Sequence, residues 1–203
     1  MAKQVWKPGT LLSPTPAALV TCGTMENPNI LTVGWTGIIN SSPAMTYVSI
    51  RPERFSHHII EENGEFCINV TTADLVRAAD FCGVRSGRDT DKFKEMKLTP
   101  LPASAVKAPI LAQSPLSLEC KVKEVKHLGS HDMFIAEIVA VDVDDKYVDE
   151  TGKLNLRQSG VIFYSHGEYF SQGKKLGQMG YTVRKKRPKN PNYKKPKKEE
   201  NDN

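Results

Sequence analysis

The segment Leu116–Val122 alternates apolar and polar residues at every step, which is the periodicity of a β-strand with two unlike faces. On one face lie Leu116, Leu118, Cys120 and Val122, and on the other Ser117, Glu119 and Lys121. The segment Glu65–Val70 shows the same alternation. Both segments are therefore predicted to be half-buried strands, and the fold around them must contain a sheet.

Further apolar runs of strand length are spread over most of the chain. Turn-forming residues separate them, as in the turn Glu26–Asn29. We predict additional strands at Ala17–Thr24, Ile30–Gly34, Met45–Ile50, Met133–Val143 and Val161–Tyr164.

Helical signals are fewer than strand signals. Ser56 is placed to cap a helix over His57–Glu62, which would stop at Asn63-Gly64. Two more helices are predicted, one capped by Thr71 or Thr72 and running to Cys82 before Gly83, and one over Thr90–Lys97. Many strands of modest length with few helices predict a mainly β fold, a β-barrel with a few helices.

The positive charge of the chain is confined to its C-terminal end. Of 203 residues, the segment 184–203 holds nine Lys or Arg and three acids, which leaves 19 bases and 20 acids in residues 1–183. We therefore predict one domain over 1–183 whose surface is not built for nucleic acid. The basic tail 184–203 has almost no aliphatic residues and is predicted to be disordered; weak binding to an anionic partner, such as nucleic acid or a membrane, is the alternative.

Composition also bears on where the protein resides. No apolar run reaches the roughly 18–20 residues of a membrane span, and the N-terminus lacks the features of a signal peptide, so we expect a cytoplasmic protein. The four cysteines are Cys22, Cys67, Cys82 and Cys120. They form no C-x-x-C pair and have apolar neighbours, so we predict buried, reduced thiols.

Standard signatures of nucleotide-binding and hydrolytic enzymes are absent. The sequence contains no G-x-G-x-x-G after a strand, no G-x-x-x-x-G-K-[ST], no H-E-x-x-H and no G-x-S-x-G. The five histidines are His57, His58, His127, His131 and His166. On a helix the adjacent pair would point about 100° apart and could not share a metal ion, so no metal site is predicted.

Arg51 follows a predicted strand and shortly precedes the predicted helix start at Ser56. The first backbone N–H groups of a helix have no partner within the helix and attract anions. The Arg51 guanidinium and the Ser56 hydroxyl would add contacts to a phosphate. In the alternative interpretation, Ser56 only caps the helix and Arg51 pairs with a surface acid.

The run Thr32–Thr36 combines two hydroxyls and an indole with Gly34, which permits a ligand to approach the backbone closely. This mixture suits a flat, partly apolar ring. A place in the core is the alternative for Trp35.

The stretch NPNILTVGWTG…SSPAMTYVSIRPERFSHHIIEENGEFCINV, within Asn27–Val70, resembles the flavin reductase-like family, and within it the flavoredoxins. Further blocks match in the same order: FCGVRSGRDTDKF at Phe81–Phe93, SPLSLECKV at Ser114–Val122, LGSHDMFIAEIVAV at Leu128–Val141 and YFSQGKKLGQMGY at Tyr169–Tyr181. The resemblance covers about residues 10–183. It implies the FMN-binding split β-barrel fold of that family.

The resemblance also implies a set of site residues. In the family, the segment matching Thr32–Thr36 lines the flavin, and a histidine matching His131 lies close to the flavin ring. The block matching Ser49–Arg51 and Ser56-His57 holds the ribityl phosphate. His131 is accordingly the expected catalytic residue. The expected cofactor-binding residues are Asn29, Thr32, Val33, Gly34, Trp35, Thr36, Ser49, Ile50, Arg51, Ser56, His57, Cys82, Gly83, Ser86 and Lys92.

The function that the resemblance implies is flavin-dependent electron transfer. We expect FMN as the cofactor, with FAD disfavoured by the short phosphate site, and NADH or NADPH as the electron donor. The expected enzyme is an NAD(P)H-dependent flavin oxidoreductase. The alternative is a flavoredoxin-type electron carrier that holds FMN tightly and does not oxidise NAD(P)H directly. The expected partners are a second copy of the chain, in a homodimer, and a redox partner protein.

Overall fold

A computed structural model describes residues 1–184 of the chain. Residues Met1–Gln172 form one compact unit, and the described residues 173–184 lie outside it. Between Gly173 and Arg184 the chain forms neither helix nor strand. Apart from Arg184, the predicted basic tail lies outside the described residues, and the domain boundary at residue 183 stays a prediction.

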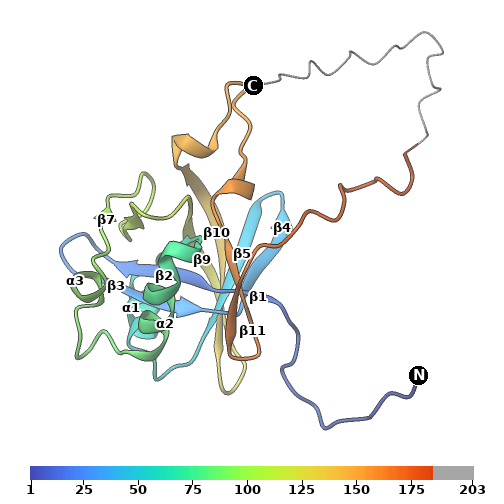
Figure 1. The fold of residues 1–203 in the computed structure, drawn as a ribbon. Helices are drawn as coiled ribbons and strands as arrows, with labels where there is room; N and C mark the ends of the chain where they lie inside the picture. Colours follow the sequence, from blue (N-terminus) through green and yellow to red (C-terminus); the bar gives the residue numbers. More distant parts are fainter. Residues whose placement is uncertain (185–203) are drawn as a thin grey trace. The chain divides into compact units, whose positions relative to one another are not determined.

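The main sheet has seven antiparallel strands in the order β3-β2-β6-β9-β10-β5-β4 (Figure 1). Their bounds are β2 Ala18–Gly23, β3 Pro28–Val33, β4 Thr36–Ser41, β5 Ala44–Ile50, β6 Glu65–Asn69, β9 Leu116–His127 and β10 Asp132–Val143. The two edge strands, β3 and β4, are joined by only Gly34 and Trp35, so the sheet must curl until its edges approach each other. The Ser49 N–H donates to the Trp35 carbonyl at 2.9 Å across this closure. The predicted β-barrel is therefore confirmed.

Smaller elements complete the compact unit. A three-stranded sheet has the order β1-β11-β12, and β7 pairs with β8. The bounds are β1 Thr15–Pro16, β7 Pro100–Leu101, β8 Ile110–Leu111, β11 Ile162–Ser165 and β12 Glu168–Ser171. The α-helices are α1 Phe55–Asn63, α2 Val76–Val84 and α3 Lys92–Met96, with short 3₁₀ helices at Ala73–Leu75, Asp145–Tyr147 and Leu156–Gln158. In Figure 1 the three α-helices gather beside β2 and β3.

Two hydrophobic clusters share strand β2, which is buried along its whole length. Alternate residues of β2, such as Val20 and Cys22, fill the barrel interior with Phe66 and Phe134. The intervening Leu19 belongs to a second cluster that β2 and β3 form with α2 and α3. Side chains of the second cluster include Ile30, Leu75, Ala78, Cys82, Phe93, Leu98 and Leu111. This packing fixes the end of α2 and the start of α3 against the barrel.

Strand β4 is not predicted by the sequence. Gly37 and the consecutive exposed residues Ile38 and Ile39 interrupt any alternation there. The strand forms because it pairs with β5, and the Thr46 hydroxyl adds a hydrogen bond of 2.9 Å to the Gly37 carbonyl. Its existence therefore depends on a neighbouring strand more than on its own sequence.

The prediction that Ser56 caps the first helix is wrong. Helix α1 begins at Phe55 with Arg54 as its N-cap, and no side chain bonds to the first turn. The Ser56 hydroxyl instead accepts a hydrogen bond of 2.6 Å from the Asn29 side chain. The predicted stop is confirmed, because Gly64 adopts a left-handed conformation with φ 65° and donates to the Ile60 carbonyl at 2.8 Å.

The other two helices differ from their predicted bounds. Thr72 precedes a 3₁₀ turn without capping it, and α2 then continues through Gly83 to Val84. The end predicted at Gly83 is thus wrong, because a helix tolerates glycine when its neighbours stay packed. Helix α3 is shorter than predicted, since the Asp91 side chain caps it by accepting from the Lys94 N–H at 3.1 Å.

The polar face of β9 is not exposed to solvent, contrary to its half-buried pattern. Ser117 and Glu119 are 2% and 0% exposed, while Lys121 is exposed. A chain segment at residues 104–111 covers this face and hydrogen-bonds to it. Local alternation cannot reveal such a cover, because the covering residues come from elsewhere in the sequence.

The four cysteines are free and buried, as predicted. Burial raises the pKa of each thiol, to about 12 for Cys22 and Cys120 and about 11 for Cys82. These thiols therefore stay protonated at neutral pH. Within residues 1–184, no helix is long and apolar enough to cross a membrane.

Candidate functional site

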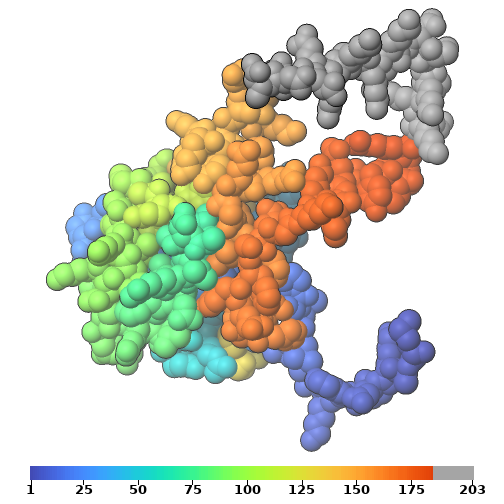
Figure 2. All heavy atoms as spheres, viewed as in Figure 1, coloured from blue at the N-terminus to red at the C-terminus, as the bar shows by residue number. Residues whose placement is uncertain are grey.

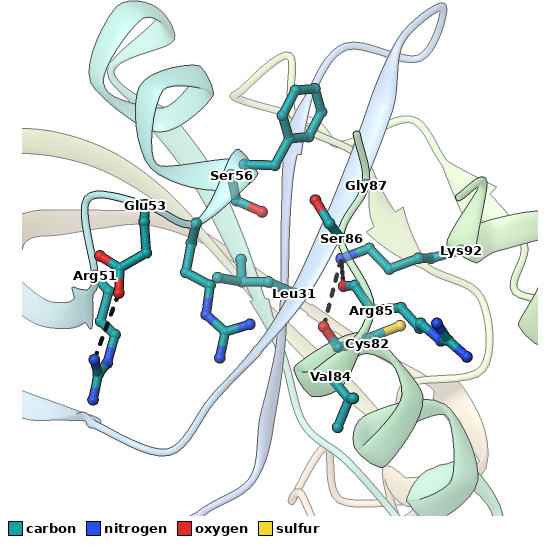
Figure 3. A pocket seen from close by; sticks show the side chains of 12 residues that line it. Leu31, Arg51, Glu53, Ser56, Cys82, Val84, Arg85, Ser86, Gly87 and Lys92 are labelled. Atoms are coloured by element: carbon teal, nitrogen blue, oxygen red, sulfur yellow. Dashed lines mark hydrogen bonds and ion pairs between the residues drawn. The ribbon is translucent and has the colours of Figure 1, made fainter. Parts of the chain in front are cut away.

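A cavity of about 360 Å³ lies between the start of α1 and the loop after α2 (Figure 3). Its lining residues are Leu31, Arg51, Glu53, Arg54, Phe55, Ser56, Cys82, Val84, Arg85, Ser86, Gly87 and Lys92. Four of these side chains are cationic, Arg51, Arg54, Arg85 and Lys92, and only Glu53 is anionic. We call this space the cationic cavity. Its charge suits an anionic group.

Lys92 is the most unusual member of the lining, because it is a lysine only 4% exposed. Its amine reaches only the carbonyls of Cys82 and Arg85, at 3.5 and 3.4 Å, as the dashed lines in Figure 3 show. No carboxylate in the described part of the chain pairs with it. Burial lowers the pKa of Lys92, and repulsion from Arg54 lowers it further. A buried ammonium without a counter-charge is costly, so the position fits an anion that completes its coordination.

The start of α1 adds uncharged donors to the same cavity. No side chain caps α1, which leaves N–H groups of its first turn available to a ligand. Ser56, 2% exposed, is held there by Asn29 on β3. Gly87 closes against this pair: a Cβ at that position would stand 2.1 Å from the Asn29 side-chain oxygen. The loop after α2 can approach β3 only because residue 87 is glycine.

The two arginines before α1 are placed differently. Arg54 donates to the Gly83 carbonyl at 3.0 Å and so ties the start of α1 to the end of α2. Arg51 forms an ion pair of 3.5 Å with Glu53, and both side chains are more than half exposed. The surface pair expected as the alternative for Arg51 is therefore present, although Arg51 also lines the cavity.

A second cavity, of about 310 Å³, adjoins the first, since Val84 lines both. It is lined by Pro16, Ala17, Thr32, Gly34, Asp80, Gly83, Val84, Tyr164, Gly167 and Tyr169. Asp80 is its only charged residue, and the Tyr169 hydroxyl donates to it at 3.4 Å. We call this space the neutral cavity. Val84 thus separates a cationic cavity from one whose single charged lining residue is an acid.

The rings of Trp35 and His131 lie against each other in a tilted arrangement. Their ring centroids are 4.4 Å apart with an interplanar angle of 35°. Trp35 is 40% exposed, so it does not take the core position considered as the alternative. Burial lowers the pKa of His131, with further lowering by Arg51 and Arg54. His131 is therefore neutral at pH 7, with one ring nitrogen, Nδ1, at 3.0 Å from the Ser130 hydroxyl.

The structure brings most of the expected site residues together. Those lining one of the two cavities are Thr32, Gly34, Arg51, Ser56, Cys82, Gly83, Ser86 and Lys92. Asn29 supports Ser56, and the Ser49 backbone holds Trp35 in place. The Thr36 hydroxyl is engaged by the Tyr47 carbonyl at 2.6 Å, on strand β5.

Three expected residues direct their side chains elsewhere. Val33 and Ile50 are 4% and 2% exposed and belong to the barrel core. His57 lines neither cavity, because its ring contacts the Asp132 carboxylate at 2.8 Å and packs edge-on against Phe134. The phosphate contact predicted for His57 does not match this side-chain position.

Sequence reasoning missed Arg54, Gly87 and Tyr164. Arg54 had a signal, since it is the second arginine in Arg51-Pro52-Glu53-Arg54, just before the helix. Gly87 and Tyr164 reach the site only through long-range packing, so no local pattern points to them.

Comparison with known proteins assigns the family. Residues 11–171 match the family described as flavin reductase like domain. The chain belongs to the flavin reductase-like family. A protein of Archaeoglobus fulgidus is 31% identical over 160 residues, covering 79% of this chain and 89% of that one. The NADH-dependent FMN reductase AsuE2 of Streptomyces nodosus subsp. asukaensis is 28% identical over 127 residues, covering 63% and 68%.

Solved structures agree with this assignment. The flavoredoxin of Desulfovibrio vulgaris (Miyazaki F) superposes with a TM-score of 0.83 at 31% identity, covering 90% of this chain and all of that one. A protein with a split barrel domain from Shewanella frigidimarina gives a TM-score of 0.73 at 27% identity, covering 83% and 86%. The predicted split-barrel fold is thereby confirmed.

Proposed function

We propose that this flavin reductase-like protein binds FMN and passes electrons from NADH or NADPH to the flavin. The observation that carries the proposal is the buried, carboxylate-free ammonium of Lys92 in a cationic cavity that opens beside a neutral one. A ligand with one anionic end and one flat, uncharged end satisfies both. The names of relatives support the choice, since one is an NADH-dependent FMN reductase and another a flavoredoxin.

The phosphate of FMN would be held in the cationic cavity. Lys92 would supply a charge-assisted hydrogen bond from a buried position, and the Ser56 hydroxyl and the first N–H groups of α1 would add neutral ones. Arg54 and Arg51 would balance the second negative charge of the phosphate. A single cationic cavity suits the single phosphate of FMN, so FAD stays the less favoured cofactor.

The residues at the neutral end would orient the ring. Bound FMN supplies the hydride and electron chemistry. Thr32 and Gly34 would line the space for the ring. Trp35 follows Gly34 in the chain, and its ring contacts the ring of His131. Because His131 is neutral, it would hydrogen-bond through its free ring nitrogen without adding positive charge. We therefore assign His131 to positioning the flavin or the nicotinamide.

The test is anaerobic addition of NADH, and separately NADPH, to the FMN-loaded protein while the visible flavin absorption is recorded. Bleaching within seconds supports a reductase and identifies its donor. If neither nucleotide bleaches the flavin but dithionite does, the protein is an electron carrier that takes electrons from a redox partner protein, and the proposed donor is wrong.

We also propose that the protein forms a homodimer. The edge strand β4 carries two consecutive exposed isoleucines, Ile38 and Ile39, which are 67% and 48% exposed at a shift in the strand register. Consecutive exposed isoleucines on an edge strand are unfavourable in a lone chain and suit a covered interface.

A further inference from the structure

Glu119 on β9 is a fully buried carboxylate on the covered outer face of the sheet. It accepts four hydrogen bonds from one short segment: from the Ser104 N–H and hydroxyl, both at 2.7 Å, the Ala105 N–H at 2.6 Å and the Val106 N–H at 3.1 Å. We call residues 104–109 the strap. Ser104 and Ala105 are themselves exposed. In Figure 2 the yellow-green atoms, which the bar places near residue 100, lie on the visible surface. One side chain thus holds the middle of a surface segment against the sheet.

Other side chains hold the rest of the strap. The Lys107 N–H donates to Glu65 at 2.9 Å, and the Cys67 thiol donates to the Ala108 carbonyl at 3.2 Å. The Thr21 hydroxyl donates to the Pro109 carbonyl. Glu119 differs from these anchors because it alone bonds to three consecutive residues. Its charge state therefore governs the strap more than any other single contact.

Asp142 on β10 shares this face with Glu119. The antiparallel register pairs Asp142 with Ser117 and Ala140 with Glu119, and directly opposed residues lie on the same face. One Asp142 carboxyl oxygen is buried and has no hydrogen-bond donor among residues 1–184. The two acidic side chains thus lie on one face, and each shifts the pKa of the other. Two neighbouring carboxyl groups can hydrogen-bond to each other only when one of them carries a proton.

The surroundings decide which of the two holds the proton. Burial and the neighbouring Glu119 carboxylate raise the pKa of Asp142 to about 6. The strap donors lower the pKa of Glu119 despite its burial. On the neighbouring strand β6, the Cys67 thiol lies opposite Glu119; burial raises its pKa, so it stays neutral. Glu65 and Lys121 oppose each other further along the same face. On the strap itself, the charged Lys107 is exposed and its backbone faces Glu65.

We propose that Glu119 and Asp142 share one proton, and that this proton is a pH-operated clamp on the strap. Below pH 6 protonated Asp142 donates to Glu119, and the Glu119 carboxylate keeps its four donors. Above pH 6 Asp142 ionises, and two adjacent carboxylates repel each other on a buried face. The strap is then held less firmly. The clamp is strongest near pH 4, because the Asp142 contribution is complete only below about pH 3.8 and stronger acid neutralises Glu119 as well.

A bound cation would be the other way to satisfy two neighbouring acids. Glu119 argues against it, because its oxygens already accept four donors. In addition, no third His, Cys, Asp or Glu within residues 1–184 joins the pair to form a metal site. The proposal rests on Glu119, Asp142 and the strap alone and does not depend on the proposed function.

The test is hydrogen exchange of strap peptides followed by mass spectrometry at pH 5 and pH 8, corrected for the intrinsic exchange rate. A carboxyl whose pKa is about 6 when clamped and 3.8 when released makes opening about tenfold more favourable at pH 8 than at pH 5. The hydrogen-exchange protection of the wild-type strap should therefore fall by the same factor from pH 5 to pH 8. Asp142→Asn cannot ionise but can still donate to Glu119, so its protection should stay high at both values of pH.

Asp144→Asn is the matched control, since Asp144 lies two residues away and pairs with Lys146 instead. The Asp144→Asn variant should show the same fall in strap protection between pH 5 and pH 8 as the wild type. A second variant, Glu119→Gln, should show low protection at both values of pH. An equal fall in strap protection between pH 5 and pH 8 in the wild type and in Asp142→Asn would overturn the proposal. So would a recovery of protection at pH 8 on adding millimolar Ca²⁺ or Mg²⁺, which would indicate a cation site.

Discussion

Replacing Lys92 with methionine isolates the phosphate contact from every other part of the site. The two side chains have similar volume, so the packing around α3 should be kept. The change removes a cation that is 4% exposed and has only two long contacts to carbonyls. Because a buried charge carries a desolvation cost, the apoprotein is expected to unfold at the wild-type temperature or above it.

The effect on FMN should be large in comparison. A hydrogen bond to a charged group contributes about 1.5–3 kcal/mol, which corresponds to a roughly 10- to 100-fold rise in the Kd for FMN. Riboflavin has the same ring and ribityl chain without the phosphate. Its affinity for the Lys92→Met variant should therefore equal its affinity for the wild-type protein.

Quenching of flavin fluorescence during titration of the apoprotein measures both affinities. Lys94→Met is the matched control, because Lys94 lies on the same helix with an exposed side chain. It should leave both Kd values unchanged. An unchanged Kd for FMN in the Lys92→Met variant would refute the phosphate assignment. A matching loss of riboflavin affinity would show that the substitution damaged the site in general.

Three further outcomes are expected. His131→Ala should slow anaerobic flavin reduction at least about tenfold in stopped-flow traces with little change in the Kd for FMN; an unchanged rate would reject its role. The free energy of unfolding of the wild type should fall as pH rises from 3.8 to about 6, because the pKa of Asp142 is raised in the folded protein. Asp142→Asn should remove this fall, so in urea unfolding at pH 8 it should be more stable than the wild type by at most about 3 kcal/mol. A variant no more stable than wild type at pH 8 would contradict that sign. Ile38→Glu should shift the light-scattering mass from dimer to monomer, whereas Leu154→Glu, at a loop residue of similar character, should not; a monomeric wild type would contradict the dimer.

The strand alternations and the Gly64 stop could be predicted because they are local. Phe66 and Ile68 fill the barrel as their period requires, and Gly64 adopts the left-handed conformation that its position after a helix indicates. The hydrogen-bond partners and the burial of polar residues were harder to predict. Ser56 fits the pattern of a cap but is engaged by Asn29, 27 residues earlier, and Glu119 fits the pattern of a solvent-facing strand residue but is covered by the strap.

The candidate site shows the same division. Arg51 could be assigned to a phosphate and Lys92 to the cofactor site from the family resemblance, and both line the cationic cavity. The side-chain direction of His57 could not, because it depends on Asp132, which lies on a strand 75 residues later. A sequence match transfers a position along the chain, whereas the direction of a side chain is set by its tertiary neighbours.

The proposed flavin site is tested most simply by the visible absorption spectrum of the protein after loading with FMN and removal of free flavin. We expect a retained flavin spectrum with about one FMN per chain, which bleaches when NADH or NADPH is added without oxygen. A protein that emerges colourless and shows no quenching of added FMN would contradict the proposal that these two cavities bind flavin.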